Sequence, residues 1–232
     1  MVHRRLPASP RHRVRRVDVG GKIDSIAGDG SAGFGGDDGP ATLASLSAPT
    51  GVAVDRSNRI YIADAGNHRI RRIDSDDTIR TMAGDGEPGF AGDGGPAELA
   101  RLQSPRGLAV DATGRVLIAD SNNNRVRRID LDGTIETIAG GGGSTSCSDE
   151  GVTATAACLA IPEGVTVDTT GRVVIADTQG HRVRMVAVDG TISSVAGSGV
   201  TGGGGDGGPA SAATLRAPAG VAVDAPGPLA HR

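Results

Sequence analysis

The chain has 232 residues, with 24 basic and 27 acidic side chains and a formal net charge of −3 at pH 7. This length fits one domain, and the near-balanced charge provides no overall attraction to nucleic acid or to an anionic membrane. Apolar runs are all shorter than the roughly 18 residues that would predict a membrane-spanning helix. The N-terminal residues are basic without the apolar core of a secretory signal peptide, which leaves the cytoplasm open as a location.

A short motif, Pro-x-Gly followed by an apolar run and Asp, recurs four times at nearly constant spacing. The intervals are 56, 57 and 56 residues, and the four copies begin at Pro49, Pro105, Pro162 and Pro218. An Arg-rich segment recurs in the same phase, beginning at His12, His68, Asn124 and His181. Copies of one unit at a fixed period are predicted to stack on each other, because a single unit cannot bury its apolar faces alone.

Residues 51–84 show what one copy contains. The alternation of β-branched residues predicts strands at residues 51–55, 59–64, 68–73 and 78–83. Asn58, in the first turn, becomes Gly114 and Gly171 in later copies, so this position is predicted to have a positive φ. The connection before the fourth strand becomes Asp-Gly in later copies, a strong hairpin signal.

Both faces of these strands are apolar. In the second strand Ile60 and Ile62 point to one side, and Tyr61 and Ala63 point to the other. A sheet with one face in water would alternate apolar with polar residues, so both faces are predicted to be covered by neighbouring sheets. The sequence therefore predicts an all-β fold, a β-propeller of four-stranded antiparallel blades with about four repeats.

The predicted organisation places a basic tail at residues 1–11, the repeat region at 12–224 and a second tail at 225–232. Complete blades are expected near residues 51–84, 107–140 and 164–197, with a partial blade built from residues 12–28 and 220–224. Because that blade lacks its second strand, we expect either an open arc of blades that self-associates or a strained four-blade ring, and we favour the arc.

A Gly-rich insertion separates the fourth strand of each copy from the next Pro-x-Gly. In one copy it covers residues 84–97 and is followed by an Ala/Leu-rich stretch to residue 102. Its recurrence at a fixed phase predicts an ordered turn followed by about one helical turn between neighbouring blades.

Two segments, at residues 62–70 and 118–126, resemble the NHL repeat, whose signature is an Asp, a turn, then Asn-His and an apolar residue. The long period and the Gly-Phe-x-Gly-Asp-Gly-Gly-Pro-Ala insertion are similar to the variant found in teneurin-type propellers and bacterial surface proteins. The resemblance implies structural roles for the signature residues Asp64, Asp120, Asp177, His68, Asn124, His181, Arg69, Arg125 and Arg182.

The resemblance implies an interaction platform for protein or surface glycan, outside the cell or on its surface, without a cofactor. A propeller lyase or hydrolase that uses the central tunnel is the alternative, although the copies are too alike to supply the dissimilar residues of an active site. RNA binding is a further alternative, since Arg pairs recur in the third strand. It is disfavoured because Phe34, Tyr61 and Phe90 are too few for base stacking.

The remaining polar residues favour structural roles over metal sites. Histidines at one phase of the repeat lie on separate blades, too far apart to share a zinc ion. The recurring Asp64, Asp120 and Asp177 are expected to accept backbone N–H bonds in the turn after their own strands. Gly-rich loops around Asp37, Asp93 and Asp206 lack the carboxylate spacing of a calcium loop.

Cys147 and Cys158 are the two cysteines of the chain, and both fall in the third insertion. We expect them to form a disulfide that staples this loop and stabilises the fold by about 3 kcal/mol, with two free thiols as the alternative. A disulfide favours an oxidising compartment, in contrast to the N-terminus, which carries no export signal.

Overall fold

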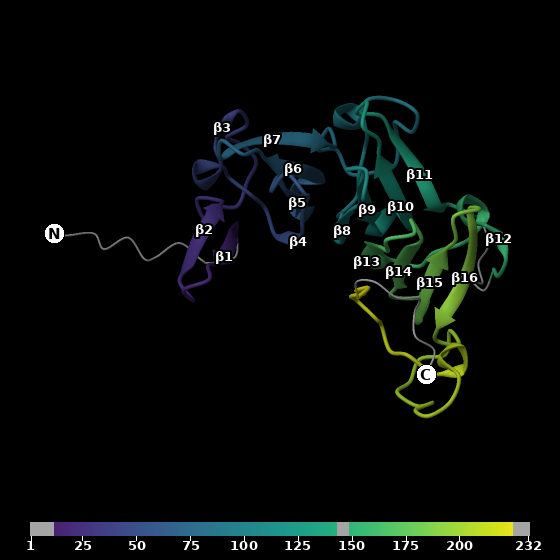
Figure 1. Ribbon diagram of the computed structural model, residues 1–232. Helices are drawn as coiled ribbons and strands as arrows, with labels where there is room; N and C mark the ends of the chain where they lie inside the picture. Colours follow the sequence, from purple (N-terminus) through teal and green to yellow (C-terminus); the bar gives the residue numbers. More distant parts are fainter. Residues whose placement is uncertain (1–11, 143–148, 225–232) are drawn as a thin grey trace.

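The computed structural model describes residues 12–142 and 149–224, and this part of the chain is built from strands and 3-10 turns. Three antiparallel sheets and one hairpin follow each other along an arc (Figure 1). The all-β, propeller-type prediction is confirmed. The hairpin consists of β1 (Val14–Val17) and β2 (Ile23–Ala27).

Each sheet is a meander whose four main strands pair in sequence order. The first sheet holds β4 (Pro49–Val54), β5 (Ile60–Asp64), β6 (Arg69–Ile73) and β7 (Thr78–Ala83). The second holds β8 (Leu108–Val110), β9 (Val116–Asp120), β10 (Arg125–Ile129) and β11 (Ile135–Gly140). The third holds β13 (Pro162–Val167), β14 (Val173–Asp177), β15 (Arg182–Val186) and β16 (Thr191–Ala196).

The first strands β4, β8 and β13 lie at the inner edge of the arc, where β8 contacts both neighbours, and the fourth strands lie at the outer edge (Figure 1).

The turn between the first two strands confirms the predicted positive φ. Asn58, Gly114 and Gly171 have φ values of 60°, 99° and 91°. Such a φ strains most side chains but suits Gly and Asn, which explains why these two residue types alternate at this position.

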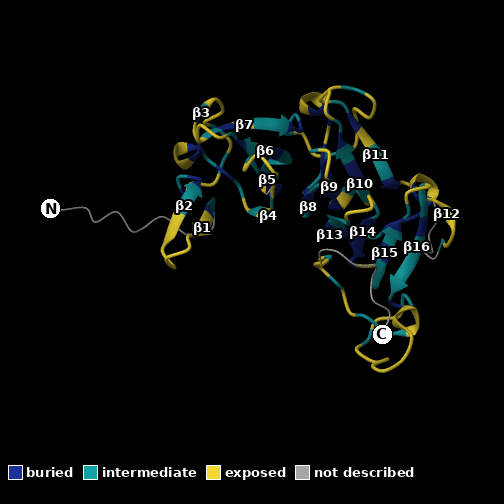
Figure 2. Ribbon diagram, viewed as in Figure 1, coloured by how far each residue is buried: buried dark blue, intermediate teal, exposed yellow. Residues whose placement is uncertain are grey.

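Both faces of the second strand of each blade, β5, β9 and β14, are buried, as predicted. Ile62 packs in a cluster with Val14 of the preceding hairpin, whereas Tyr61 and Ala63 pack in a cluster with Ile118 of the following sheet. Figure 2 shows the buried residues along the strands of the three sheets, with exposed residues at turns, insertions and β2. Stacked blades thus share their apolar faces, and each fully buried Ile contributes about 1.5–3 kcal/mol.

The insertions extend the next blade by one more strand, which the sequence analysis did not predict. β3 (Gly39–Pro40) pairs with β7, β12 (Val152–Thr153) pairs with β16, and Pro96 forms a single bridge with Thr134. Each insertion then makes one helical turn, as predicted, in the 3-10 form. These are η2 (Ala41–Leu43), η4 (Ala97–Leu99), η6 (Ala154–Ala156) and η7 (Ala210–Ala212).

The two ends of the described chain lie apart on the arc (Figure 1). Residues 220–224 form no strand, so the prediction of a strand there was wrong: no described strand lies beside them to share the hydrogen bonds of a sheet. β1 likewise pairs only with β2 in the described part of the chain. None of the helical turns between residues 12 and 142 or 149 and 224 has the length or the apolar character to cross a membrane.

Candidate binding site at the axial mouth

Successive inner strands approach each other so closely that the glycine of Pro-x-Gly has no room for a side chain. A Cβ at Gly107 would lie 2.5 Å from the carbonyl oxygen of Glu163, and one at Gly164 would lie 2.8 Å from that of Ala219. A Cβ at Gly51 would likewise clash with the carbonyl oxygen of Arg106. The glycines therefore bring the inner strands together at one end of the propeller axis.

The residue between Pro and Gly lies in a β-bulge. Pro49 faces Asp64 and Gly51 faces Ala63, so Thr50 is the extra residue of β4, and Glu163 has the same place in β13. A bulge re-aims the side chain of its extra residue. The variable residues Thr50 and Glu163 are thus displaced from the regular pattern of their strands.

These residues line a hollow of about 330 Å³, which we call the axial mouth. It is lined by residues 50–52, 106–108, 163–165 and 219–221. Arg106 donates to Glu163 at 2.5 Å, with 42% and 22% of the two side chains exposed, and Thr50 Oγ1 donates to the carbonyl of Pro105 at 3.1 Å. A guanidinium, a carboxylate and a hydroxyl therefore converge where the four repeats meet.

The sequence analysis missed this site because it compared what the repeats share. The site could have been found from the middle residue of Pro-x-Gly, which differs between the four copies. It is Thr50, Arg106, Glu163 and Ala219. Residues at the same position of adjacent repeats meet at the axis. A position whose chemistry differs between the repeats, next to a glycine that all four repeats share, therefore indicates a binding site at the axis. The opposite end of the axis is a smaller hollow of about 180 Å³, lined by residues 54–56, 110–112 and 167–169.

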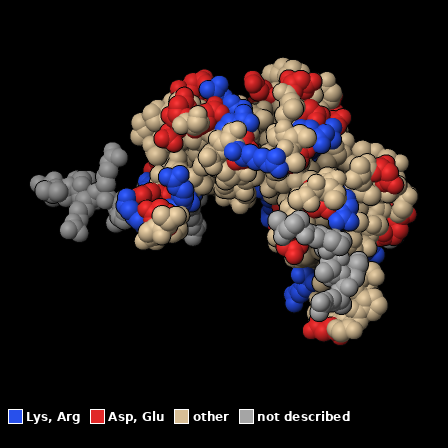
Figure 3. All heavy atoms as spheres, viewed as in Figure 1, with Lys and Arg blue, Asp and Glu red and all other residues tan. Residues whose placement is uncertain are grey.

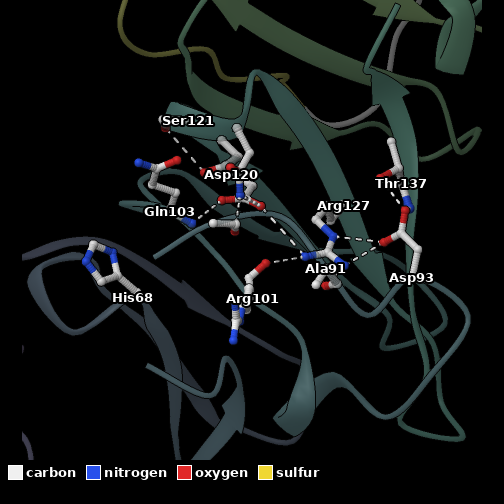
Figure 4. A network of polar contacts seen from close by, with 12 residues as sticks. His68, Ala91, Asp93, Arg101, Gln103, Asp120, Ser121, Arg127 and Thr137 are labelled. Atoms are coloured by element: carbon white, nitrogen blue, oxygen red, sulfur yellow. Dashed lines mark hydrogen bonds and ion pairs between the residues drawn. The ribbon is translucent and has the colours of Figure 1, made fainter. Parts of the chain in front are cut away.

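The signature aspartates are fully buried at the ends of the second strands, and Figure 4 shows Asp120 with its partners. Asp120 Oδ1 accepts from the backbone N–H of Gln103 at 2.7 Å, and Oδ2 accepts from Asn123 at 2.8 Å. Asp64 and Asp177 accept from Ser47 and Ala160 in the same way. The backbone N–H donor thus lies in the segment before the first strand of the blade. The prediction that this donor lies in the turn after the aspartate's own strand was wrong.

Burial raises the pKa of these carboxyls. It raises the pKa of Asp120 to about 6, against the lowering effect of hydrogen bonds from Asn123 and Gln103 and of the Arg127 charge. The same cause raises the pKa of Asp177 to about 6. Asp177 Oδ2 has no hydrogen-bond partner among the described residues, because Gly180 occupies the position that Asn123 has in the preceding repeat. Desolvation of a carboxylate disfavours its charged form.

The signature His and Asn residues connect one repeat to the next. His68 Nδ1 accepts from the backbone N–H of Ser104 at 3.1 Å, and Asn124 Oδ1 accepts from Ile161 at 2.8 Å. Both residues have a left-handed backbone conformation, and His181 accepts from Ala217 at 3.2 Å. The side chain therefore fixes the turn before the following Pro-x-Gly. The backbone N–H of that turn requires an acceptor, and either His or Asn can provide one.

The signature arginines hold the start of the insertion in their own repeat. Arg69 donates to the carbonyl of Asp85 at 2.5 Å, and Arg182 donates to that of Ser198 at 2.7 Å. The guanidinium groups of Arg69 and Arg125 stack over Phe34 and Phe90, both at 3.8 Å from the ring centroid. The two phenylalanines are therefore engaged by arginines within the protein.

Each Arg pair of the third strand divides between two environments. Arg127 is fully buried and donates to Asp93 of the insertion at 2.6 Å and to the carbonyl of Arg101 at 2.8 Å (Figure 4). Its neighbour Arg128 pairs with Asp130 at 2.9 Å on the outside. On the face seen in Figure 3, basic and acidic groups alternate without a continuous basic surface.

Cys158 is disulfide-bonded, and no described cysteine is free. Cys147 lies outside the described residues, so the pairing of the two remains a prediction. Among residues 12–142 and 149–224, no three His, Cys, Asp or Glu side chains are grouped in a way that could hold a metal ion.

Comparison with known protein families finds NHL repeats in the chain. The model of the NHL repeat matches residues 46–73 and 159–184, and the model of the teneurin NHL domain matches residues 85–148. These segments cover parts of all three sheets. The chain therefore has an NHL-repeat fold.

Curated relatives share this similarity over small parts of their own length. Protein SUPPRESSOR OF QUENCHING 1 of Arabidopsis thaliana is 38% identical over 43% of the chain and 9% of its own length. Teneurin-1 of mouse is 29% identical over 93% of the chain and 9% of its own length. NHL repeat-containing protein 2 of chicken is 32% identical over 49% of the chain and 16% of its own length. The chain thus spans less than a fifth of these relatives.

Solved structures support the fold alone. A structural genomics protein of unknown function from Bacteroides thetaiotaomicron superposes with a TM-score of 0.65 at 21% identity, over 91% of the chain and 48% of its own. A streptogramin B lyase superposes with a TM-score of 0.51 at 12% identity, over 79% of the chain and 47% of its own.

Proposed function

We propose that the chain is a non-catalytic NHL-propeller binding module that captures a protein or a surface glycan at the axial mouth. The observation that carries this proposal is the convergence of Thr50, Arg106 and Glu163 at the one place where otherwise similar repeats meet. We further propose that the Gly-rich insertions make it a teneurin-type variant of the fold.

The chemistry of the axial mouth suits a ligand rich in hydroxyl or amide groups. Arg106 supplies N–H donors, Glu163 supplies acceptors, and both side chains remain partly exposed. Hydrogen bonds to charged groups are stronger than neutral ones, so even a shallow site can select a polar ligand by their arrangement. The hollow of about 330 Å³ is within the range of small-molecule sites and matches a sugar or a short peptide segment.

A binding role fits these residues better than turnover. The carboxylate that could act as a base, Glu163, is held by a guanidinium at 2.5 Å, and the other lining residues are Thr, Gly, Ala, Val and Leu. A propeller lyase or hydrolase is expected to need a second acid or base at hydrogen-bond distance from the reacting group.

The experiment probes a glycan array and a random-peptide array with the labelled chain. Arg106→Ala combined with Glu163→Ala should abolish retention on whichever array the chain recognises, because both charged groups of the site are lost together. The control is Arg56→Ala, which truncates a charged side chain at the opposite end of the axis. Retention that persists in the double variant, with an unchanged circular dichroism spectrum, would contradict the proposal. Ligand consumed by the chain would favour the enzyme.

A further inference from the structure

A hollow of about 500 Å³ lies between the first and second blades, which Figure 1 shows side by side, and we call it the inter-blade hollow. One wall comes from the first blade, and the other comes from the second insertion and the second blade. The inter-blade hollow shares no lining residue with the axial mouth or with the hollow at the opposite end of the axis. Its volume is within the range of small-molecule sites.

Three arginines of the first blade line one wall: Arg59, Arg72 and Arg80. Arg59 Nε donates to Asp55 at 2.6 Å. The other two arginines share Asp74, which lies 2.7 Å from Arg72 Nε and 3.0 Å from Arg80 Nε. The terminal nitrogens of Arg59 and Arg80 have no hydrogen-bond acceptor among the described residues, and 38% and 47% of these side chains are exposed. This wall therefore presents guanidinium groups whose N–H donors can bind a ligand.

The strand pairing of the first blade brings two of these positive charges together. Arg72 of β6 lies directly opposite Arg80 of β7, and like charges in such a pair are destabilising. At the same positions of the second blade, Arg128 lies directly opposite Glu136 and forms an ion pair with it. Two arginines thus share one carboxylate in the first blade, whereas two carboxylates share one arginine in the second. A local rule that is broken in only one of these two similar blades points to a function for the additional positive charge.

The facing wall carries hydrogen-bond acceptors. Glu98 of the second insertion lines it, together with Asp130 and Asp132 at the turn between β10 and β11. Asp130 pairs with Arg128 at 2.9 Å, and Asp132 Oδ1 accepts from the hydroxyl of Thr134 at 2.7 Å. In the described part of the chain no ion pair joins this wall to the arginines of the first blade. A bare anion would face these carboxylates, whereas the hydroxyl groups of a larger ligand would donate to them.

Apolar side chains complete the lining of the inter-blade hollow. They belong to Met82, Ile129 and Leu131, and Leu131 is 73% exposed. A ligand with C–H groups would remove part of this apolar surface from water, which is favourable. The inter-blade hollow thus combines anion-binding groups, hydroxyl acceptors and an apolar surface.

We propose that the inter-blade hollow binds a small sugar that carries an acidic group, either a carboxylate or a phosphate. The acidic group accepts hydrogen bonds from Arg59, Arg72 and Arg80, because guanidinium groups match the geometry of both kinds of oxyanion. Hydroxyl groups of the sugar donate to Glu98 and Asp132 on the facing wall. This site is separate from the axial mouth and does not depend on the function proposed there.

Isothermal titration calorimetry with four free ligands tests the proposal: glucuronate, glucose-6-phosphate, glucose and inorganic phosphate. One or both of the acidic sugars should bind, and the tighter of the two identifies the acidic group. Glucose should bind at least about tenfold more weakly because it lacks the charge, and inorganic phosphate at least about tenfold more weakly because it lacks the sugar hydroxyls. An unmodified chain that binds neither acidic sugar, or that binds glucose or inorganic phosphate as tightly, would overturn the proposal.

Arg80→Glu gives the first blade the charge arrangement of the second, where Glu136 lies opposite Arg128. Affinity for the acidic sugar should fall at least about tenfold, because one guanidinium is replaced by a like charge to the ligand. The Tm should be unchanged or higher, since opposite charges then face each other across the strand pair. Unchanged affinity would overturn the proposal. A lower Tm would also overturn it, because Arg80 would then stabilise the contact between the blades.

Glu136→Arg provides the matched control, because it exchanges the same two residue types at the corresponding position of the second blade, outside the lining of the inter-blade hollow. It should bind the acidic sugar like the unmodified chain, and equal losses in Arg80→Glu and Glu136→Arg would contradict the assignment. The variant that combines Arg106→Ala with Glu163→Ala should also keep the affinity, since the axial mouth shares no residue with this hollow. Loss of binding in that variant would place the acidic sugar at the axial mouth. Circular dichroism of each variant checks that the fold is retained.

Discussion

Gly107→Ala measures how much the close approach of the inner strands restricts the Pro-x-Gly glycine. The added Cβ would lie 2.5 Å from the carbonyl oxygen of Glu163 and 3.0 Å from the Cα of Gly164. Both neighbours are backbone atoms, which cannot rotate away as a side chain could. The strands must therefore separate at the axial mouth, and small-to-large changes in packed regions cost about 1–3 kcal/mol.

The backbone of Gly107 does not have a positive φ, so alanine fits it without conformational strain. Alanine at such a site would otherwise stabilise a protein by about 0.4–1 kcal/mol through the unfolded state. We therefore expect Gly107→Ala to lower the free energy of unfolding by about 1–2 kcal/mol. For a chain of this size that corresponds to a fall in Tm of about 2–8 °C.

Gly220→Ala is the matched control at the same phase of the fourth copy, where a Cβ would meet no atom within 4 Å. Its Tm should be unchanged or slightly raised. Differential scanning calorimetry of the two variants and the unmodified chain at one protein concentration makes the comparison. Equal Tm values for Gly107→Ala and Gly220→Ala would refute the steric explanation of the motif.

Four further predictions concern the conserved contacts within the repeats. Asp93→Ala leaves the fully buried Arg127 without its nearest carboxylate and should lower the free energy of unfolding by about 3 kcal/mol. Asp206→Ala, at an exposed position, should change this free energy by less than about 0.5 kcal/mol when both variants are measured by urea titration at the same dilution. Burial raises the pKa of Asp120 and Asp177 to about 6, so the folded chain binds more protons than the unfolded chain between about pH 4 and pH 6. The free energy of unfolding should then fall as the pH rises through this window, by up to about 3 kcal/mol for each carboxyl, and a flat profile in urea titrations would contradict the assignment. His68→Asn should keep the Tm because Asn124 makes the equivalent bond at 2.8 Å, while His68→Ala should lose about 1 kcal/mol in thermal unfolding. Alkylation of the denatured, unreduced chain should label neither Cys147 nor Cys158, and labelling of either would exclude their disulfide.

The strands and turns could be predicted because they depend on local patterns. Alternating β-branched residues fix which residues pair, and the exchange of Asn58 for glycine indicates a positive φ from sequence alone. The two buried faces also follow from the sequence. Tyr61 and Ile62 are adjacent in a strand, so their side chains point to opposite faces of the sheet, and both are apolar. These features need no knowledge of the neighbouring blade.

Contacts between blades could not be predicted in the same way. The Gly39–Pro40 strand has a composition typical of turns and forms a ladder only because β7 offers a free edge beside it. The partner of Asp120 is Gln103, which lies 17 residues earlier and comes close only when the blade has folded. The axial mouth depends on residues from four repeats, so its composition becomes visible only when the repeats are aligned at the axis.

Hydroxyl-radical footprinting of the chain with its captured glycan or peptide tests the central claim most directly, because it reports the accessibility of individual side chains. Binding at the axial mouth should protect Val52 and Arg106 and leave Val54 and Val110, at the opposite end of the axis, as reactive as in the free chain. Protection confined to residues 54–56 and 110–112, or to the Gly-rich insertions, would contradict the assignment of the axial mouth as the binding site.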